Sequence, residues 1–483
     1  MRAKYWCAVG LAALIGNGAA QAQSSSTAPV KTTSTVTVLP ATSGVGTVKG
    51  SQVIQTQAAD AKPDKMPEAI PAPAASAPAA APAACDQCSQ PPADEGPLGP
   101  TPPSQVKCLQ DWMAGQCQWF AEGTGCDGKK TPPCLTTFGW MDFDYTFRST
   151  GHGETGIAPV MNRFGDEALV RQLGWAISKP LDPKCLSFGF NSILIAGADA
   201  AFLNPTAGWP KADDPRFGLS FTDLNATAHL PILTEGGVDV KAGRQTTVLG
   251  PMGALPFQRY FDSSDYAWFN LEEGRYTGVA ANWHITKRLD WYNAIEIGGW
   301  GVFFDNPSGP CYLGQINYWL DEDAKKAQLT FTVLTGPTGV GGGNTTTTEI
   351  TLHLNPNKYV YDVFSNQLTY SKAPVFFQGP PPPGYQERAY DIYNYLGVHC
   401  SKCVDFNTRW EWYKDVDGGG YAGGFGIPHT NYFELTLGID YHPNKWLQVR
   451  PEIRGDFADY DAFGENKDKK DQLSLAVDAL IKF

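Results

Sequence analysis

The sequence has 483 residues and a formal net charge of −12, with 51 Gly and 37 Pro. The length allows two or three ordinary domains, while the acidic balance offers no basic surface for phosphates and argues against a nucleic-acid-binding protein. After residue 20 there is no apolar run of the roughly 20 residues that a membrane-spanning helix needs, which excludes a polytopic helical membrane protein.

Aromatic residues divide the chain into two parts. The chain has 14 Trp, 20 Tyr and 25 Phe, yet the first 135 residues contain only Tyr5, Trp6, Trp112, Trp119 and Phe120. We therefore expect an extended head followed by an aromatic-rich body over residues 136–483.

The first 22 residues have the features of a secretory signal peptide. Arg2 and Lys4 form a basic start, an apolar run follows over residues 5–15, and residues 20–22 (Ala-Gln-Ala) are a small-x-small cleavage site. Residues 23–84 are first Ser/Thr-rich and then Ala/Pro-rich, a composition that cannot bury a core and favours polyproline II. We expect an exported protein in which residues 23–84 form a disordered linker.

The chain has 11 cysteines, and removal of Cys7 with the signal peptide leaves an even number. In an exported protein this favours disulfides. The two C-x-x-C motifs lack both the second pair of a structural zinc site and the His of a haem attachment motif, so disulfides are preferred over metal or redox roles, and no metal site and no cofactor are predicted. The disulfide candidates are the cysteines of the Cys-rich segment, residues 85–135, and of the second C-x-x-C motif, residues 400–403. They are Cys85, Cys88, Cys108, Cys117, Cys126, Cys134, Cys400 and Cys403.

From residue 136 onwards, several segments alternate apolar and polar residues with the two-residue period of a β-strand. In residues 404–413, for example, Phe406 and Trp410 fall on one face and Arg409 and Glu411 on the other. A soluble β-sandwich and a transmembrane β-barrel both produce this alternation.

The connections between the alternating segments favour the barrel. Short connections, such as residues 399–403 and 442–444, alternate with long ones, such as 414–430 and 458–471. Outer-membrane barrels have short turns at one end and longer loops at the other. We therefore predict an all-β, antiparallel transmembrane barrel of about 16 strands, within a range of 12 to 18. Because Arg171 interrupts the apolar face of the second expected strand, 12 or 14 strands are the main alternatives. The expected strands are 136–148, 168–179, 185–199, 217–231, 236–249, 275–285, 289–304, 311–320, 327–335, 346–354, 358–372, 389–399, 404–413, 431–442, 445–457 and 472–483.

The last segment, residues 472–483, alternates along its length and ends the chain on Phe. It resembles the carboxy-terminal signal strand by which the barrel-assembly machinery recognises outer-membrane proteins, and this resemblance implies that machinery as a partner. An ordinary final strand of a secreted domain is the alternative. The residues assigned to the signal are Leu475, Val477, Ile481 and Phe483.

A family resemblance rests on residues 441–444 (Tyr-His-Pro-Asn), 446–447 (Trp-Leu) and 450–454 (Arg-Pro-Glu-Ile-Arg), followed by Asp456 and the terminal Phe strand. These segments resemble the OmpL-like putative beta-barrel porin family of bacterial outer membranes. The resemblance covers at most residues 136–483, and the Cys-rich head departs from it. It implies a passive diffusion channel for small solutes or ions in the outer membrane, in contact with lipid and without catalytic residues. Family analogy also suggests a homotrimer.

A barrel of about 16 strands leaves an aqueous channel, whereas one of about eight is filled by side chains. Pore radius and lumen charge would then set selectivity. Rows of Arg and Glu on neighbouring strands would either create a transverse field or pair to hold the wall together. The pore-lumen candidates are Arg409, Glu411, Glu434, Asp440, Arg450, Glu452, Arg454 and Asp456. The outward aromatic residues expected at the membrane interfaces are Trp300, Trp319, Trp412, Tyr441 and Trp446.

Two other functions compete with the channel. In a secreted all-β carbohydrate-binding protein or hydrolase, carboxylate pairs such as Glu272 and Glu273, or Asp213 and Asp214, would serve as acid and base. Adjacent carboxylates are usually solvated charges, however, and the seven His show no metal-ligand spacing. The third hypothesis is a membrane anchor whose periplasmic head, residues 23–135, contacts the cell wall.

Overall fold

The computed structural model describes residues 122–124, 130–133, 135–151, 153–154, 162–203, 216–299, 309–321, 326–337, 344–372, 386–418, 428–464 and 466–483. The expected signal peptide and linker, all six cysteines of the Cys-rich segment, Asp213, Asp214 and Trp300 lie outside these residues. Within the Cys-rich segment, β1 (Glu122–Thr124) and β2 (Lys130–Pro133) pair antiparallel. No described helix is both long and apolar enough to cross a membrane.

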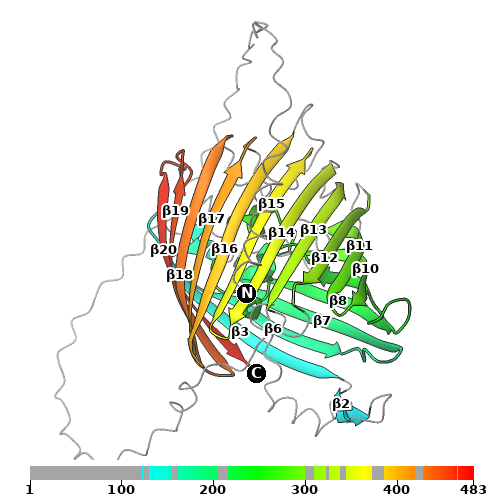
Figure 1. Ribbon diagram of the computed structural model, residues 1–483. Helices are drawn as coiled ribbons and strands as arrows, with labels where there is room; N and C mark the ends of the chain where they lie inside the picture. The colour runs from blue at the N-terminus through cyan, green and yellow to red at the C-terminus, as the bar shows by residue number, and fades with distance from the viewer. Residues whose placement is uncertain are drawn as a thin grey trace, which may run out of the picture. The chain divides into compact units, whose positions relative to one another are not determined.

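Sixteen strands form one closed antiparallel barrel, shown in Figure 1 as a ring of tilted strands. Each strand pairs with its neighbours in sequence, except that the short β4 (Gly153–Glu154) and β5 (Phe164–Gly165) pair with each other, and β20 pairs with β3 to close the ring. All sixteen expected strands are present, which confirms the predicted fold. The barrel strands are β3 (Thr136–Arg148), β6 (Glu167–Lys179), β7 (Ser187–Gly197), β8 (Gly218–Leu230), β9 (Val238–Thr246), β10 (Arg275–Thr286), β11 (Leu289–Gly299), β12 (Cys311–Trp319), β13 (Ala327–Pro337), β14 (Asn344–Asn357), β15 (Val360–Ser371), β16 (Glu387–Ser401), β17 (Val404–Asp415), β18 (Thr430–Asn444), β19 (Leu447–Ala458) and β20 (Asp471–Lys482).

The two ends of the barrel differ in the connections that they carry. At one end, here called the turn end, β3 begins, β20 ends, and the strands are joined by residues 180–186, 231–237, 287–288, 320–326, 358–359, 402–403 and 445–446. At the other end, the loop end, most connections are longer, and they comprise residues 149–166, 198–217, 247–274, 300–310, 338–343, 372–386, 416–429 and 459–470. The predicted alternation of short and long connections is therefore confirmed.

The pleat of the strands turns apolar side chains outward and polar side chains inward. In β17, Phe406 and Trp410 are 39% and 43% exposed, whereas Arg409 and Glu411 are at most 2% exposed. A soluble protein buries its large apolar side chains and exposes its charges. The reverse arrangement fits a barrel whose outer wall faces lipid.

Exposed aromatic side chains lie near both ends of the barrel. Toward the loop end they include Phe147, Tyr370, Tyr390, Phe433 and Phe457, and toward the turn end Phe188, Trp291, Tyr318, Phe406, Tyr441 and Trp446. The expectation for Trp319 was wrong, because this side chain is only 8% exposed. Its neighbours Tyr318 and Leu320 are 40% and 44% exposed, so the pleat of β12 turns Trp319 to the interior.

A β-bulge explains the interruption at Arg171. Asp142 pairs with Gln172 and Phe143 with Val170, so Arg171 is the extra residue on β6. An extra residue breaks the two-residue period and re-aims the side chains beside it. Consequently both Arg171 and Gln172 are fully buried.

The cysteines of the body differ from expectation. Cys403 is disulfide-bonded, and so is Cys185, which was not among the candidates. Cys400 is an exposed free thiol, so its expected disulfide is wrong. It follows the inward-facing His399 on β16, and the alternation of the strand therefore turns its thiol to the outer surface, while Cys403 is buried in the turn.

Candidate functional site

The connection between β9 and β10, residues 247–274, runs through the barrel interior. Gln315 of β12 donates a hydrogen bond to the carbonyl of Val248 at 2.6 Å. Gln172 of β6 donates to the carbonyl of Ala254 at 2.8 Å. Because β12 and β6 are well separated around the ring, a segment that contacts both inner faces crosses the lumen. We call residues 247–274 the inward loop.

The composition of the inward loop accounts for its position. Leu255, Phe257, Phe261 and Trp268 are all buried, and the ring of Phe257 packs edge-on against Trp140 of β3 with centroids 5.1 Å apart. Burial of each large apolar side chain contributes about 1.5–3 kcal/mol relative to exposure in water. An apolar segment of this kind is therefore stabilised inside the barrel rather than in solvent.

Two short helices, η3 (Pro256–Gln258) and α4 (Tyr266–Asn270), give the inward loop internal structure. Asp265 caps α4, since its carboxylate accepts a hydrogen bond from the N–H of Trp268 at 2.6 Å. This bond satisfies one of the N–H groups that a helix start leaves without a partner.

Two carboxylates of the wall bind backbone N–H groups of the inward loop. Glu411 of β17 accepts hydrogen bonds from the first two N–H groups of α4, at 2.7 and 3.0 Å. Glu452 of β19 accepts from the N–H groups of Asp262 and Ser263, at 2.8 and 3.2 Å. An intramolecular hydrogen bond contributes about 0.5–1.5 kcal/mol, so together these bonds fix the centre of the loop to one wall.

Three arginines of the same wall bind the carbonyls of the loop. Arg409 donates to the carbonyl and the hydroxyl of Ser263, at 2.8 and 3.0 Å. Arg450 donates to two carbonyls, those of residues 256 and 259, at 2.7 Å each, and Arg454 donates to the carbonyl of Ser264. Each arginine also forms an ion pair within the wall: Arg409 with Glu434, Arg450 with Asp478, and Arg454 with Asp456.

Other parts of the ring bind the loop as well. Arg171, at the bulge of β6, forms an ion pair with Asp262. Arg259 of the loop lies 3.3 Å from Asp199 of α3 (Ala198–Phe202), the short helix that follows β7. The inward loop is therefore held by charged side chains from separate arcs of the barrel, and it narrows the interior between them.

All eight pore-lumen candidates lie on the inner face, and none is more than 8% exposed. Glu434 reaches the loop only through Arg409, and Asp440 lies apart at the turn end beside His442. The six that contact the inward loop directly are Arg409, Glu411, Arg450, Glu452, Arg454 and Asp456, the last through the hydroxyl of Tyr266.

The carboxylate pair Glu272 and Glu273 is not solvated, contrary to expectation, because the inward loop carries both residues into the interior. Burial raises the pKa of Glu272 well above its usual range, and the nearby carboxylates of Asp265 and Glu349 raise it further. Gln367 of β15 donates a hydrogen bond to the same carboxyl group.

The carboxy-terminal residues complete the ring. Backbone hydrogen bonds of 2.7 and 2.8 Å join Gly139 of β3 to Phe483, and a Cβ on Gly139 would lie only 2.5 Å from the Phe483 ring. Leu475 and Val477 face outward, and Ile481 pairs with Met141 of β3. Their part in recognition by the assembly machinery stays a prediction.

Comparisons with known proteins identify a family and two distant solved structures. Residues 135–483 match the family described as "Putative beta-barrel porin-2, OmpL-like". No curated protein matches the chain in sequence. Among solved structures, the anion-selective porin from Comamonas acidovorans has a TM-score of 0.50 at 11% identity, with 72% of this chain and 99% of that chain covered. The outer membrane channel DcaP of Acinetobacter baumannii has a TM-score of 0.48 at 11% identity, with 75% and 100% covered.

The two solved structures are distant in sequence, and the first indicates a shared fold only. The family match extends over most of the chain and coincides with the sixteen-stranded barrel. The chain therefore belongs to the putative beta-barrel porin-2, OmpL-like family, and it is an outer-membrane porin.

Proposed function

We propose that small solutes and ions diffuse passively through the barrel past the inward loop, which forms the narrowest section of the channel. The observation that carries this proposal is the anchoring of residues 247–274 across the interior by Arg409, Glu411, Arg450 and Glu452. Pore size and the charges that line a constriction set selectivity in channels. The wall charges therefore act by fixing the position of the loop.

The head is assigned to the periplasmic side. The proposal rests on β3, which begins at the turn end directly after residue 135, and on the carboxy terminus, which lies at the same end. Short turns of outer-membrane barrels lie in the periplasm. The Ala/Pro-rich linker then extends through the periplasm, and residues 23–135 contact the cell wall.

Planar-bilayer conductance tests the channel. The full chain is expected to give stepwise openings, and a variant with residues 255–270 replaced by a short Gly/Ser linker is expected to give openings of at least twofold higher conductance. Removal of residues 23–135 should leave the conductance unchanged. A folded barrel that never conducts would contradict the proposal and favour the membrane anchor.

The secreted alternative is tested by solubility and gel migration. A barrel in the outer membrane requires detergent for extraction, and its folded form migrates differently before and after boiling. A chain that is soluble without detergent and migrates identically would support a secreted all-β binding protein or hydrolase.

Light scattering in detergent measures the assembly, for which a mass of three chains is expected.

A further inference from the structure

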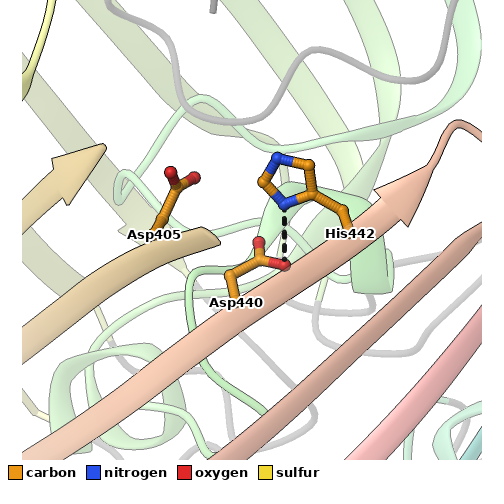
Figure 2. A group of neighbouring side chains, drawn as sticks. All are labelled: Asp405, Asp440 and His442. Carbon is orange, nitrogen blue, oxygen red and sulfur yellow. Dashed lines mark hydrogen bonds and ion pairs between the residues drawn. The ribbon is translucent and has the colours of Figure 1, made fainter. Parts of the chain in front are cut away.

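At the turn end, strands β17 and β18 bring two carboxylates and an imidazole together on the inner wall. Asp405, near the start of β17, is the direct cross-strand partner of Asp440, near the end of β18. His442 follows two residues later on the same face of β18. One possible ligand atom from each residue lies within 4.8 Å of the other two, and Figure 2 shows the three side chains converging. We call Asp405, Asp440 and His442 the mouth cluster.

The two aspartates of the mouth cluster form an electrostatic conflict. Like charges placed directly opposite each other on neighbouring strands are destabilising. Their recorded cationic partners are imidazoles, His399 for Asp405 and His442 for Asp440, and among the described residues no ion pair joins either aspartate to Lys or Arg. Glu411 and Glu434 also lie directly opposite each other in the same strand pair. There, however, Arg409 pairs with one carboxylate and the inward loop binds the other.

One distance within the mouth cluster matches the spacing of two ligands on a metal ion, and the three possible ligand atoms all lie within 4.8 Å of one another. The Nδ1 atom of His442 and the Oδ1 atom of Asp440 are 3.4 Å apart. Hydrogen bonds between charged groups are shorter, about 2.7–2.9 Å. Two ligands bound to Zn²⁺ at about 2.0–2.1 Å in tetrahedral geometry are separated by about 3.3–3.4 Å.

Neighbouring side chains orient the two carboxylates. His399 Nδ1 lies 2.8 Å from Oδ1 of Asp405, and Gln448 of β19 donates to Oδ2 of Asp440 at 2.7 Å. One oxygen of each carboxylate is thus held by an outer partner, and the other stays available as a ligand. Outer partners of this kind orient metal ligands in known sites.

We propose that the mouth cluster binds one Zn²⁺ ion or a similar divalent transition-metal ion, through one imidazole nitrogen and two carboxylate oxygens. An imidazole ligand favours Zn²⁺, Cu²⁺ or Ni²⁺ over Mg²⁺ and Ca²⁺. Three protein ligands leave the fourth position to water. The partial exposure of His442 opens that position to the channel. The metal resolves the conflict between the two aspartates and adds a cationic site to the lumen.

A second group of His and Asp side chains at the same end provides a matched control. His284 contacts Asp239 at 3.2 Å and Asp290 at 3.0 Å. Within the part of the chain that the structure describes, only the mouth cluster brings three possible ligand atoms within reach of one ion. His284→Gln therefore removes a paired imidazole from the turn end without removing a proposed ligand.

Equilibrium dialysis of the full-length, oxidised protein in detergent against Zn²⁺ tests the site. We expect one Zn²⁺ per chain in the wild type, at least 10-fold weaker binding in His442→Gln and in Asp440→Asn, and unchanged binding in His284→Gln. A thousandfold excess of Mg²⁺ should not displace the Zn²⁺. Heat-modifiable migration confirms that each variant is folded, and Zn²⁺ should raise the Tm of the wild type but not that of His442→Gln.

Several outcomes would overturn the proposal. The first is the absence of Zn²⁺ binding to the folded wild type. Another is that all three variants bind Zn²⁺ as well as the wild type does. A third is that His284→Gln loses as much Zn²⁺ binding as His442→Gln does. Binding that persists in His442→Gln and Asp440→Asn but disappears after alkylation of thiols would assign the metal to cysteines instead.

Discussion

Arg409 illustrates how one side chain supports both the wall and the inward loop. Its guanidinium pairs with Glu434, binds Ser263, and lies 5.1 Å from the ring centroid of Phe261. The Phe261 ring has room because position 438 is Gly, and a Cβ there would approach the ring to 2.9 Å. Only a planar group with several donors can pair with Glu434, bind Ser263 and lie against the Phe261 ring at once, so a lysine cannot replace Arg409.

Substitution of Arg409 should strongly destabilise the folded barrel. Arg409→Ala leaves Glu434 buried without its cation, and breaking a buried ion pair in this way costs about 3–5 kcal/mol. Arg216→Ala, which breaks an exposed pair with Glu167, is the control and should cost about 0–1 kcal/mol. Urea titration of the folded gel band measures both, and similar midpoints for the two variants would contradict the role of Arg409.

The raised pKa of Glu272 predicts how the free energy of unfolding depends on pH. Because its pKa is raised in the folded protein, the folded state holds this proton more tightly than the unfolded state. The free energy of unfolding therefore falls as the pH rises from the ordinary range of Glu through the raised pKa. Glu272→Gln removes the titration and should show a smaller fall in Tm between pH 4 and pH 9 than the wild type. Parallel curves for Glu272→Gln and wild type would refute the assignment.

At the scale of single elements, the strands could be predicted because their signal is local. Alternation of side chains is a property of each strand, so the residues of β17 or β19 reveal it without knowledge of their neighbours. The failures also have local causes. The bulge at Arg171 breaks the two-residue period. For Trp319, an error of one residue in the expected alternation was enough to assign the side chain to the outer instead of the inner face.

The inward loop and the mouth cluster depend on tertiary contacts, which explains why the sequence did not indicate them. A search for ligand spacing along the chain does not find Asp405 with Asp440, because strand pairing brings them together. The apolar residues of the inward loop were the one available signal. A connection containing Leu255, Phe257 and Phe261 is too apolar for an exposed loop.

Strand β20 makes a prediction about assembly. Deletion of Phe483 removes both hydrogen bonds to Gly139 and the ring above it, whereas Phe483→Leu keeps the backbone contacts. If Phe483 is part of the assembly signal, its deletion should lower the folded fraction in cells severalfold more than it lowers refolding of purified protein into lipid vesicles. Equal losses in both assays would indicate a contribution to stability alone.

For the molecule as a whole, the distribution of buried charge predicts ion preference. Apart from Glu272 and Glu273, whose pKa values burial raises, the described residues bury 16 Asp and Glu side chains, compared with eight Arg and no Lys. An excess of carboxylates inside a channel attracts cations and repels anions. Reversal potentials in a KCl gradient should therefore show K⁺ permeating better than Cl⁻, with the preference reduced at high salt because of screening. A preference for Cl⁻ would contradict this.

The pairing of β20 with β3 also constrains when the barrel can fold. Gln472 accepts a hydrogen bond from Thr150, 322 residues earlier in the sequence, and contacts between such distant residues slow folding. Until the first and last strands meet, their edges expose backbone groups that lipid cannot satisfy. The ring therefore cannot close before the last strand has met the first, and until then the open strand edges are prone to aggregation.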